Sequence, residues 1–285
     1  MHTSVLDCLL EYEVSGPAHF LFNIEAAFHA GQEVTEERLT ITPSMKVRHF
    51  CDERSGNRFI RLDAPNGVLS VNYHARVQLQ ALPVPLQLNE TPVSALPDEV
   101  LHYLMPSRYC ESDSLSRVAQ QMFGRLPPGM SRVQAIESWI YESIQYQPGF
   151  TQSTTTARDV FVQRIGVCRD FAHLGITLCR ALNIPARLVV GYVNFEEPPQ
   201  DFHAVFEAWL DGRWVTFDAT RSAPIDRLVR IGTGRDAKDV AFATIFGAVK
   251  MLRMAITVDE GEMPPGDAAP DRLTPTAAAV NAAGF

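Results

Sequence analysis

The sequence is poor in the features that mark membrane-spanning, secreted and nucleic-acid-binding proteins. No apolar run approaches the roughly 20 residues that cross a bilayer, and the amino terminus lacks a basic stretch followed by a long apolar core. No run of Lys or Arg suggests a nucleic-acid footprint, and the 285-residue chain carries a net charge of −8. Five cysteines without regular spacing do not make a disulfide framework. We therefore expect a cytoplasmic protein with no membrane or nucleic-acid partner.

Signatures of metal and cofactor binding are also lacking. The sequence contains no EF-hand loop and no acidic cluster that would argue for calcium. Residues Gly232–Asp236 read GTGRD and lack the GK[ST] ending of a phosphate loop. Cys168 and Cys179 would lie about three turns apart on one helix, too far for a shared zinc ion. The sequence therefore predicts neither a metal nor a cofactor.

The composition leaves room for a large folded core, because 46% of the residues are hydrophobic and 20% are charged. Short, often alternating apolar runs fill residues 1–90 and predict an N-terminal antiparallel β-sandwich or barrel. Prolines mark a linker over residues 91–110. Helical patterns followed by strands then extend over residues 111–258, and residues 259–285 have little to bury and are expected to be disordered. The expected fold class is α+β.

A helical pattern from Cys168 to Leu182 places a thiol in the first turn of a helix. The positive end of the helix dipole favours thiolate, which is the reactive form of cysteine. The N–H of Cys168 has no partner within the helix and can point at a developing oxyanion. Small residues on the same helical face, such as Gly175, would let another element pack close beneath the thiol.

A β-hairpin is the predicted partner of this helix. Strands from Phe202 to Leu210 and from Arg213 to Asp218 flank the turn signal Asp211-Gly212. A two-residue turn makes His203 and Asp218 diagonal neighbours on one side of the sheet, about 7 Å apart by backbone. A three-residue loop would shift the register by one and put them on opposite faces. The proximity of the two side chains therefore depends on the turn.

Cys168, His203 and Asp218 can each take one role in a thiol-dependent reaction. His203 would take the proton of Cys168 or form an ion pair with its thiolate, and would later protonate the leaving amine. Asp218 would fix the imidazole tautomer and stabilise its charged form. The rival base His173 lies five residues past Cys168, about 140° around the helix, and points away. A second oxyanion donor is left open among Trp139, Tyr146 and Gln163.

The chain resembles the transglutaminase-like superfamily of papain-like Cys-His-Asp enzymes. The matching segments are GVCRDFAHL at Gly166–Leu174, IPARLVVGY at Ile184–Tyr192, DFHAVFEAWL at Asp201–Leu210 and RWVTFDAT at Arg213–Thr220. Within that superfamily it is similar to the bacterial transglutaminase-like cysteine proteases, which carry an N-terminal β domain, a junction like YLMPSRYCESD and a late segment like GRDAKDVAFATIFG. The resemblance implies a transglutaminase-like core with Cys168 as nucleophile, His203 as base and Asp218 as orienting acid.

The expected activity is acyl transfer at peptide or side-chain amides through a thioester on Cys168. Hydrolysis, as in a cysteine protease or amidase, is favoured, because no feature of the sequence indicates active-site walls that would exclude water from the thioester. A protein-glutamine transamidase is the alternative, since it shares every step up to deacylation. A non-catalytic binding or scaffold module of the same fold is a further alternative. The expected partner is a peptide or protein substrate.

Overall fold

Alternating burial along the first strands explains the N-terminal sandwich. The computed structural model describes residues 2–80, 83–195 and 200–261. In β1 (His2–Val14), every second side chain from Leu6 to Val14 is buried, and β6 (Gly67–Leu79) repeats the pattern. Because successive side chains of a strand point to opposite faces, this alternation gives each sheet one face for a shared core. The predicted β-sandwich is thereby confirmed.

Two four-stranded sheets make up this sandwich, in the orders β14-β1-β6-β3 and β13-β2-β5-β4. The pairs of neighbouring strands in both sheets are antiparallel. The remaining strands are β2 (Ala18–Phe22), β3 (Gln32–Thr42), β4 (Val47–Cys51), β5 (Arg58–Ala64), β13 (Ala243–Phe246) and β14 (Val249–Gly261).

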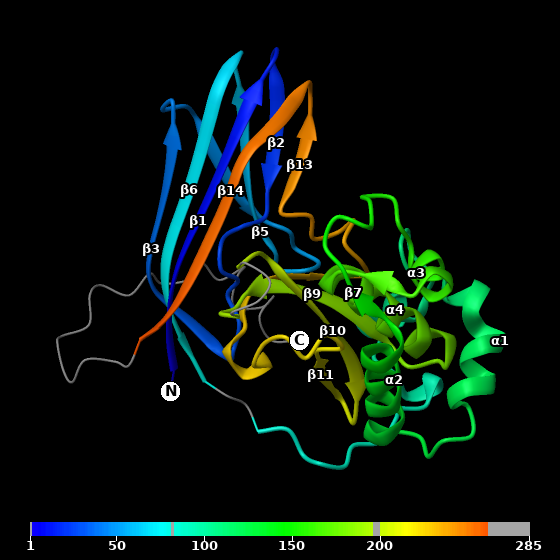
Figure 1. The fold of residues 1–285 in the computed structure, drawn as a ribbon. Coiled ribbons are helices and arrows are strands. Elements are labelled where there is room, and N and C mark those ends of the chain that lie inside the picture. Colours follow the sequence, from blue (N-terminus) through cyan, green and yellow to red (C-terminus); the bar gives the residue numbers. More distant parts are fainter. Residues whose placement is uncertain (1, 81–82, 196–199, 262–285) are drawn as a thin grey trace.

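The last two strands of the chain return to this N-terminal sandwich. β14 pairs with β1 along its length, and β13 pairs with β2 (Figure 1). The sequence predicts one domain over residues 111–258, yet the structure places residues 243–261 in the sheets of the sandwich. The disordered tail predicted to begin at Asp259 is also wrong in its first residues, because β14 continues to Gly261; residues 262–285 lie outside the described part of the chain.

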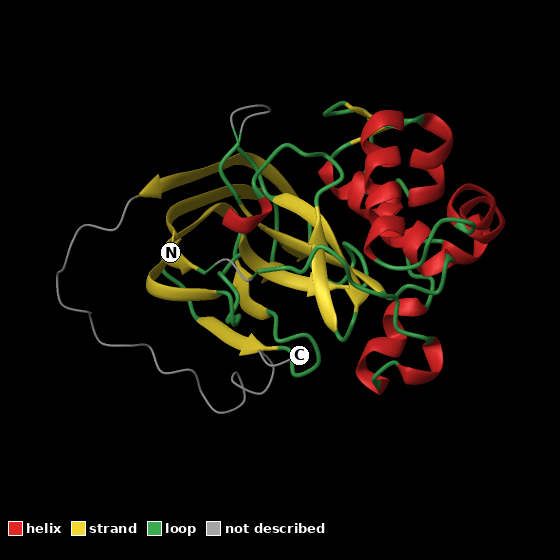
Figure 2. Ribbon diagram, turned by 90° about the horizontal axis from the view of Figure 1, so that it is seen from below, coloured by secondary structure: helices red, strands yellow, loops and turns green. Residues whose placement is uncertain are grey.

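The middle of the chain forms a helix–sheet domain. Its four-stranded sheet has the order β11-β10-β9-β12, and its α-helices gather on one side of it (Figure 2). The strands are β9 (Ala186–Tyr192), β10 (His203–Leu210), β11 (Arg213–Phe217) and β12 (Val229–Gly234), with a short pair β7 (Gln145–Tyr146) and β8 (Ile165–Gly166). The helices are η1 (Val93–Ala95), η2 (Asp98–Leu104), α1 (Ser112–Phe123), α2 (Met130–Ser143), α3 (Ala157–Gln163), α4 (Cys168–Ala181) and η3 (Ile225–Arg227).

Helix α4 is the centre of this domain. It packs against α1, α2, α3 and strand β10, and its residues from Asp170 to Arg180 are buried. A Cβ atom at Gly175 would come within 2.7 Å of the Phe206 ring. Only glycine therefore permits the close approach of α4 to β10, as the small residues of this face predict. No helix in the described part of the chain has the length and apolar composition needed to cross a membrane.

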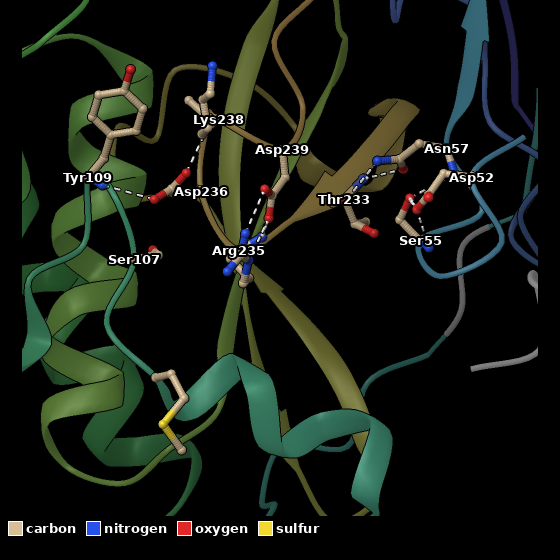
Figure 3. A network of polar contacts seen from close by, with 12 residues as sticks. Asp52, Ser55, Asn57, Ser107, Tyr109, Thr233, Arg235, Asp236, Lys238 and Asp239 are labelled. Atoms are coloured by element: carbon tan, nitrogen blue, oxygen red, sulfur yellow. Dashed lines mark hydrogen bonds and ion pairs between the residues drawn. The ribbon is translucent and has the colours of Figure 1, made fainter.

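Strand β12 and the loop after it join the two parts of the molecule. The side-chain amide of Asn57, from the sandwich, bonds to both the N–H and the C=O of Thr233 at 2.9 Å (Figure 3). Asp236, just after β12, accepts a 2.9 Å hydrogen bond from the N–H of Tyr109. The buried Tyr192 hydroxyl donates to the C=O of Ile24 at 2.6 Å. The Asn57 and Tyr192 contacts fix the sandwich against the helix–sheet domain, and the Asp236 contact ties the loop after β12 to Tyr109.

Candidate active site

Two local features set the start of helix α4 at Cys168. Val167 has an extended backbone, and its N–H donates a 3.0 Å hydrogen bond to Oδ2 of Asp170. The Asp170 carboxylate also accepts from the Thr151 hydroxyl at 2.6 Å, and only 1% of this residue is exposed. A side chain at Gly166 would come within 2.8 Å of the Asp170 Cβ, so glycine is required there. The thiol is thus held at the first position of a firmly capped helix.

The register of the β10–β11 hairpin is the one that the turn signal predicts. Leu210 pairs with Arg213 across the two-residue turn. Asp211 and Gly212 adopt positive φ angles of 44° and 76°, which is the backbone pattern of a type I′ turn. The paired residue numbers therefore keep a constant sum along the hairpin, and His203 and Asp218 fall on the same side of the ribbon.

His203 and Asp218 are in direct contact. Nε2 of His203 lies 2.9 Å from Oδ2 of Asp218, and both side chains are buried. The other carboxylate oxygen, Oδ1, accepts from the N–H of Thr220 at 2.9 Å and from its hydroxyl at 2.7 Å. Burial alone would raise the pKa of Asp218, but the hydrogen bonds from His203 and Thr220 hold it below its usual value. Asp218 is therefore an anion oriented from both sides.

Cys168 completes a cluster with these two residues. Its Sγ lies 3.8 Å from the C=O of Phe202, the residue before His203. Burial would lower the pKa of His203, but its hydrogen bonds to Asp218 and Cys168 outweigh this effect and raise the pKa to about 10. Since Nε2 faces Asp218, Nδ1 is the ring nitrogen left for the sulfur. The arrangement places a charged imidazolium beside the Cys168 sulfur, as thiol-dependent acyl transfer requires.

Tyr146 is the aromatic residue that lies beside the thiol. The bridge between β7 and β8 pairs Tyr146 with Gly166, two residues before Cys168. Burial raises the pKa of Tyr146, and the neighbouring Cys168 adds to this rise. The Tyr146 hydroxyl and the N–H of Cys168 are therefore two neighbouring groups that can donate hydrogen bonds to an oxyanion.

The other two candidates for the second donor lie elsewhere. The Trp139 ring stacks on Phe161 with centroids 5.7 Å apart, and the Arg164 guanidinium lies 4.8 Å above it. Trp139 thus belongs to the packing of α2 against α3. Gln163 is exposed at the end of α3. Of the three residues that the sequence leaves open, the structure brings only Tyr146 to Cys168.

The rival base His173 also lies away from the thiol. Its Nε2 accepts a 3.1 Å hydrogen bond from the N–H of Ala237, and its ring stacks on Tyr109 with centroids 5.2 Å apart. Burial lowers its pKa to about 4, so it is neutral. The structure agrees with the helical spacing that turns His173 away from Cys168.

Two residues of the site are missed by the sequence analysis. Thr220 bonds to Asp218 with the i, i+2 geometry of an Asx turn, and the DAT motif is the signal that could have revealed it. Asp170 holds the start of α4, and a carboxylate in the third position of a helix is a known capping signal. Both act on the position of a site residue.

No group of three or more His, Cys, Asp or Glu side chains in the described ranges could hold a metal ion.

Comparison with known proteins agrees with this geometry. The description "Transglutaminase-like superfamily" matches residues 116–219, and "Bacterial transglutaminase, N-terminal domain" matches residues 4–97. The chain is similar to the crystal structure of "a Putative Cysteine Protease from Cytophaga hutchinsonii": 40% identity over 96% of this chain and 95% of that chain, with a TM-score of 0.87. It is also similar to uncharacterized proteins of Mycobacterium leprae (28% identity, 63% of this chain, 68% of the relative) and Mycobacterium tuberculosis (27% identity, 73% and 75%).

Proposed function

The chain belongs to the transglutaminase-like superfamily, and from that premise we propose that it is a thiol-dependent acyl-transfer enzyme that hydrolyses peptide or side-chain amides. The observation that carries the proposal is the buried contact of His203 with Asp218 next to Cys168, a thiol at a helix N-terminus. The resemblance to a chain described as a cysteine protease supports the same reaction class.

Acylation follows from the roles of five groups. The Cys168 thiolate attacks the carbonyl carbon of a bound amide, and a tetrahedral oxyanion forms. The N–H of Cys168 and the Tyr146 hydroxyl donate hydrogen bonds to that oxyanion. The His203 imidazolium, oriented through Nε2 by Asp218, transfers a proton to the leaving nitrogen. The C–N bond then breaks, an amine or ammonia departs, and a thioester remains on Cys168.

Deacylation decides between a hydrolase and a transamidase. His203, now neutral, removes a proton from an incoming water molecule, and the second tetrahedral intermediate collapses to a carboxylic acid and free Cys168. An amine that enters instead would form a new amide. Hydrolysis is the simpler outcome because it requires no device to exclude water from the thioester.

A partition experiment tests the proposed reaction. A library of N-acylated peptides and of glutamine-containing peptides is incubated with the protein, with and without a primary amine. Acid products should form in both conditions and predominate over amide products. Amide products in excess would identify a transamidase. The absence of a Cys168 thioester in intact-protein mass spectra for every donor would point to a non-catalytic module instead.

A further inference from the structure

A cavity of about 640 Å³ lies between the two parts of the molecule, away from Cys168. One wall comes from η2, a second from the loop between β4 and β5, and the floor from strands β9, β10 and β11. Three aromatic rings line it: Tyr103, Trp209 and Trp214. The volume and the aromatic lining of this cavity are typical of sites that bury a small organic molecule or the end of a peptide.

Arg187 supplies a cation beside the aromatic rings of this cavity. Its guanidinium stacks on the Trp214 ring at 4.1 Å, and its Nε donates to Oε2 of Glu207 at 2.7 Å. Only 8% of the residue is exposed. Within the described residues, none of its hydrogen bonds uses the two terminal nitrogens, and neither nitrogen is sealed off from solvent. A buried guanidinium already stacked on Trp214 thus presents two terminal nitrogens as free hydrogen-bond donors at the cavity wall.

The charges around Arg187 do not balance. Glu207, itself 1% exposed, pairs with both Arg187 and Arg230. Two guanidinium cations therefore share one carboxylate, and the buried group carries a net positive charge. The lowered pKa of His29, about 4, agrees with this: burial is the main cause, and Arg230 and Arg187 add to it, against an opposing effect of Glu207. A buried cation without a full counter-charge favours an anionic ligand.

The rim of the cavity restricts which anion fits. The exposed carboxylates Glu53 and Glu99 lie there together with Arg54. These three side chains give the entrance a net charge of −1, which disfavours a phosphate or another polyanion more than a singly charged ligand. A carboxylate matches the fork of a guanidinium in shape and brings only one negative charge.

We propose that this cavity is a second binding site, which takes the carboxylate of a ligand with an apolar or aromatic body: the carboxylate on Arg187, the body between Tyr103, Trp209 and Trp214. The chemistry is shared by a free aromatic acid and by the C-terminus of a peptide. Trp209 lies six residues along β10 from His203, about 20 Å away, so the site is separate from the thiol.

Tryptophan fluorescence and calorimetry test the proposal, since two of the three tryptophans line the cavity. The probes are N-acetylphenylalanine and a short peptide ending in phenylalanine, each compared with its C-terminal amide. The full chain and Cys168→Ala should bind the acids equally. The amides should bind about 10- to 100-fold more weakly, which is the effect of losing a charged hydrogen-bonding partner. Arg187→Lys should weaken acid binding to a similar extent, and the exposed control Arg117→Lys should not.

Each outcome of these binding experiments either supports or contradicts the proposed carboxylate site. Binding of both acids supports a site that recognises the carboxylate itself, and binding of the peptide alone identifies a peptide C-terminus as the ligand. If Arg187→Lys fails to fold, Trp214→Leu takes its place and should weaken binding of the aromatic acids. Equal affinity for acid and amide, or no binding at millimolar concentration, overturns the proposal. Binding lost in Cys168→Ala would mean that the probe occupies the candidate active site, which also overturns it without contradicting the acyl-transfer activity.

Discussion

Leu210 pairs with Arg213 across a turn of only two residues, and this pairing decides where His203 and Asp218 meet. The side-chain period of a strand is two, so a slip of one residue would carry Asp218 to the opposite face. The strongly turn-forming Asp211-Gly212 pair, with both φ angles positive, is what prevents that slip.

Lengthening this turn should lower activity by an amount that depends on whether an odd or an even number of residues is inserted. One glycine inserted between Asp211 and Gly212 should shift β11 by one residue and lower kcat/KM more than about 10³-fold, because His203 loses its orienting carboxylate. Two inserted glycines preserve the facing and should cost about 10-fold or less. Circular dichroism confirms folding of both variants. Similar losses in the two would refute the dependence on register.

Cys168 should be the reactive thiol of the chain. At mildly acidic pH, iodoacetamide should label Cys168 before the exposed Cys51, because only Cys168 has an imidazolium partner. Cys8 and Cys110 are buried, and burial raises the pKa of each to about 12, so they should not react in the folded protein. Peptide mapping by mass spectrometry gives the order of labelling. In Cys168→Ala we expect turnover to fall about 10⁴-fold or more with an unchanged fold.

Thr220 should act on catalysis through Asp218. Asp218→Asn should keep the geometry but favour the wrong imidazole tautomer, and lower kcat by about 10²- to 10⁴-fold. Thr220→Val removes one hydrogen bond to Asp218 and should lower kcat by about 3- to 10-fold. Thr220→Ser retains the hydroxyl and serves as the matched control. A Thr220→Val enzyme with the kinetics of the wild type would show that the hydrogen bond from the Thr220 hydroxyl is not needed.

Tyr146→Phe should remove one oxyanion donor and keep the ring. We expect kcat to fall by about 10²- to 10³-fold with KM nearly unchanged, because the lost hydrogen bond belongs to the transition state. The control is Tyr141→Phe, since the ring of this half-exposed tyrosine lies 4.4 Å beneath the Arg221 guanidinium and phenylalanine retains that contact. Steady-state kinetics on a peptide amide measure both. A raised KM with unchanged kcat would assign Tyr146 to substrate binding instead.

The stability contribution of His203 should depend on pH. Its pKa is about 10 in the folded protein and has an ordinary value of 6.5. Because the folded protein binds the His203 proton more tightly than the unfolded chain, His203 contributes its full stabilising free energy below pH 6.5. This contribution is lost as the pH rises toward 10. The excess stability of the wild type over His203→Gln should therefore shrink between about pH 6 and about pH 9.5 in urea titrations. A constant or growing difference would contradict the raised pKa.

Local chemistry explains why so much of the site could be predicted. The helix beginning at Cys168, the Asp211-Gly212 turn and the strand parity of His203 and Asp218 each depend on residues close in sequence. The choice of Tyr146 over Trp139 did not follow, because it requires the bridge between β7 and β8, two segments about twenty residues apart whose strands have only two residues each. The catalytic roles themselves stay predictions until the variants are measured.

Non-local pairing explains the main errors of the sequence analysis. The predicted domain over residues 111–258 includes β13, yet the partner of β13 is β2, which lies near the other end of the chain. Residues Asp259 to Gly261 have little to bury, yet they continue β14 because β1 offers backbone partners. Composition and periodicity describe one segment at a time, so they carry no information about which distant strand a segment pairs with.

The pairing of β14 with β1 has a consequence for synthesis of the protein. Strand β1 and one of its neighbours, β6, are both translated before the helix–sheet domain, but its second neighbour, β14, is translated only after that domain. Until β14 is translated, β1 is an open sheet edge, able to pair with other chains. We therefore expect the interior helix–sheet domain to reach its native form before the sandwich that precedes it, so that maturation of this protein runs against the direction of translation.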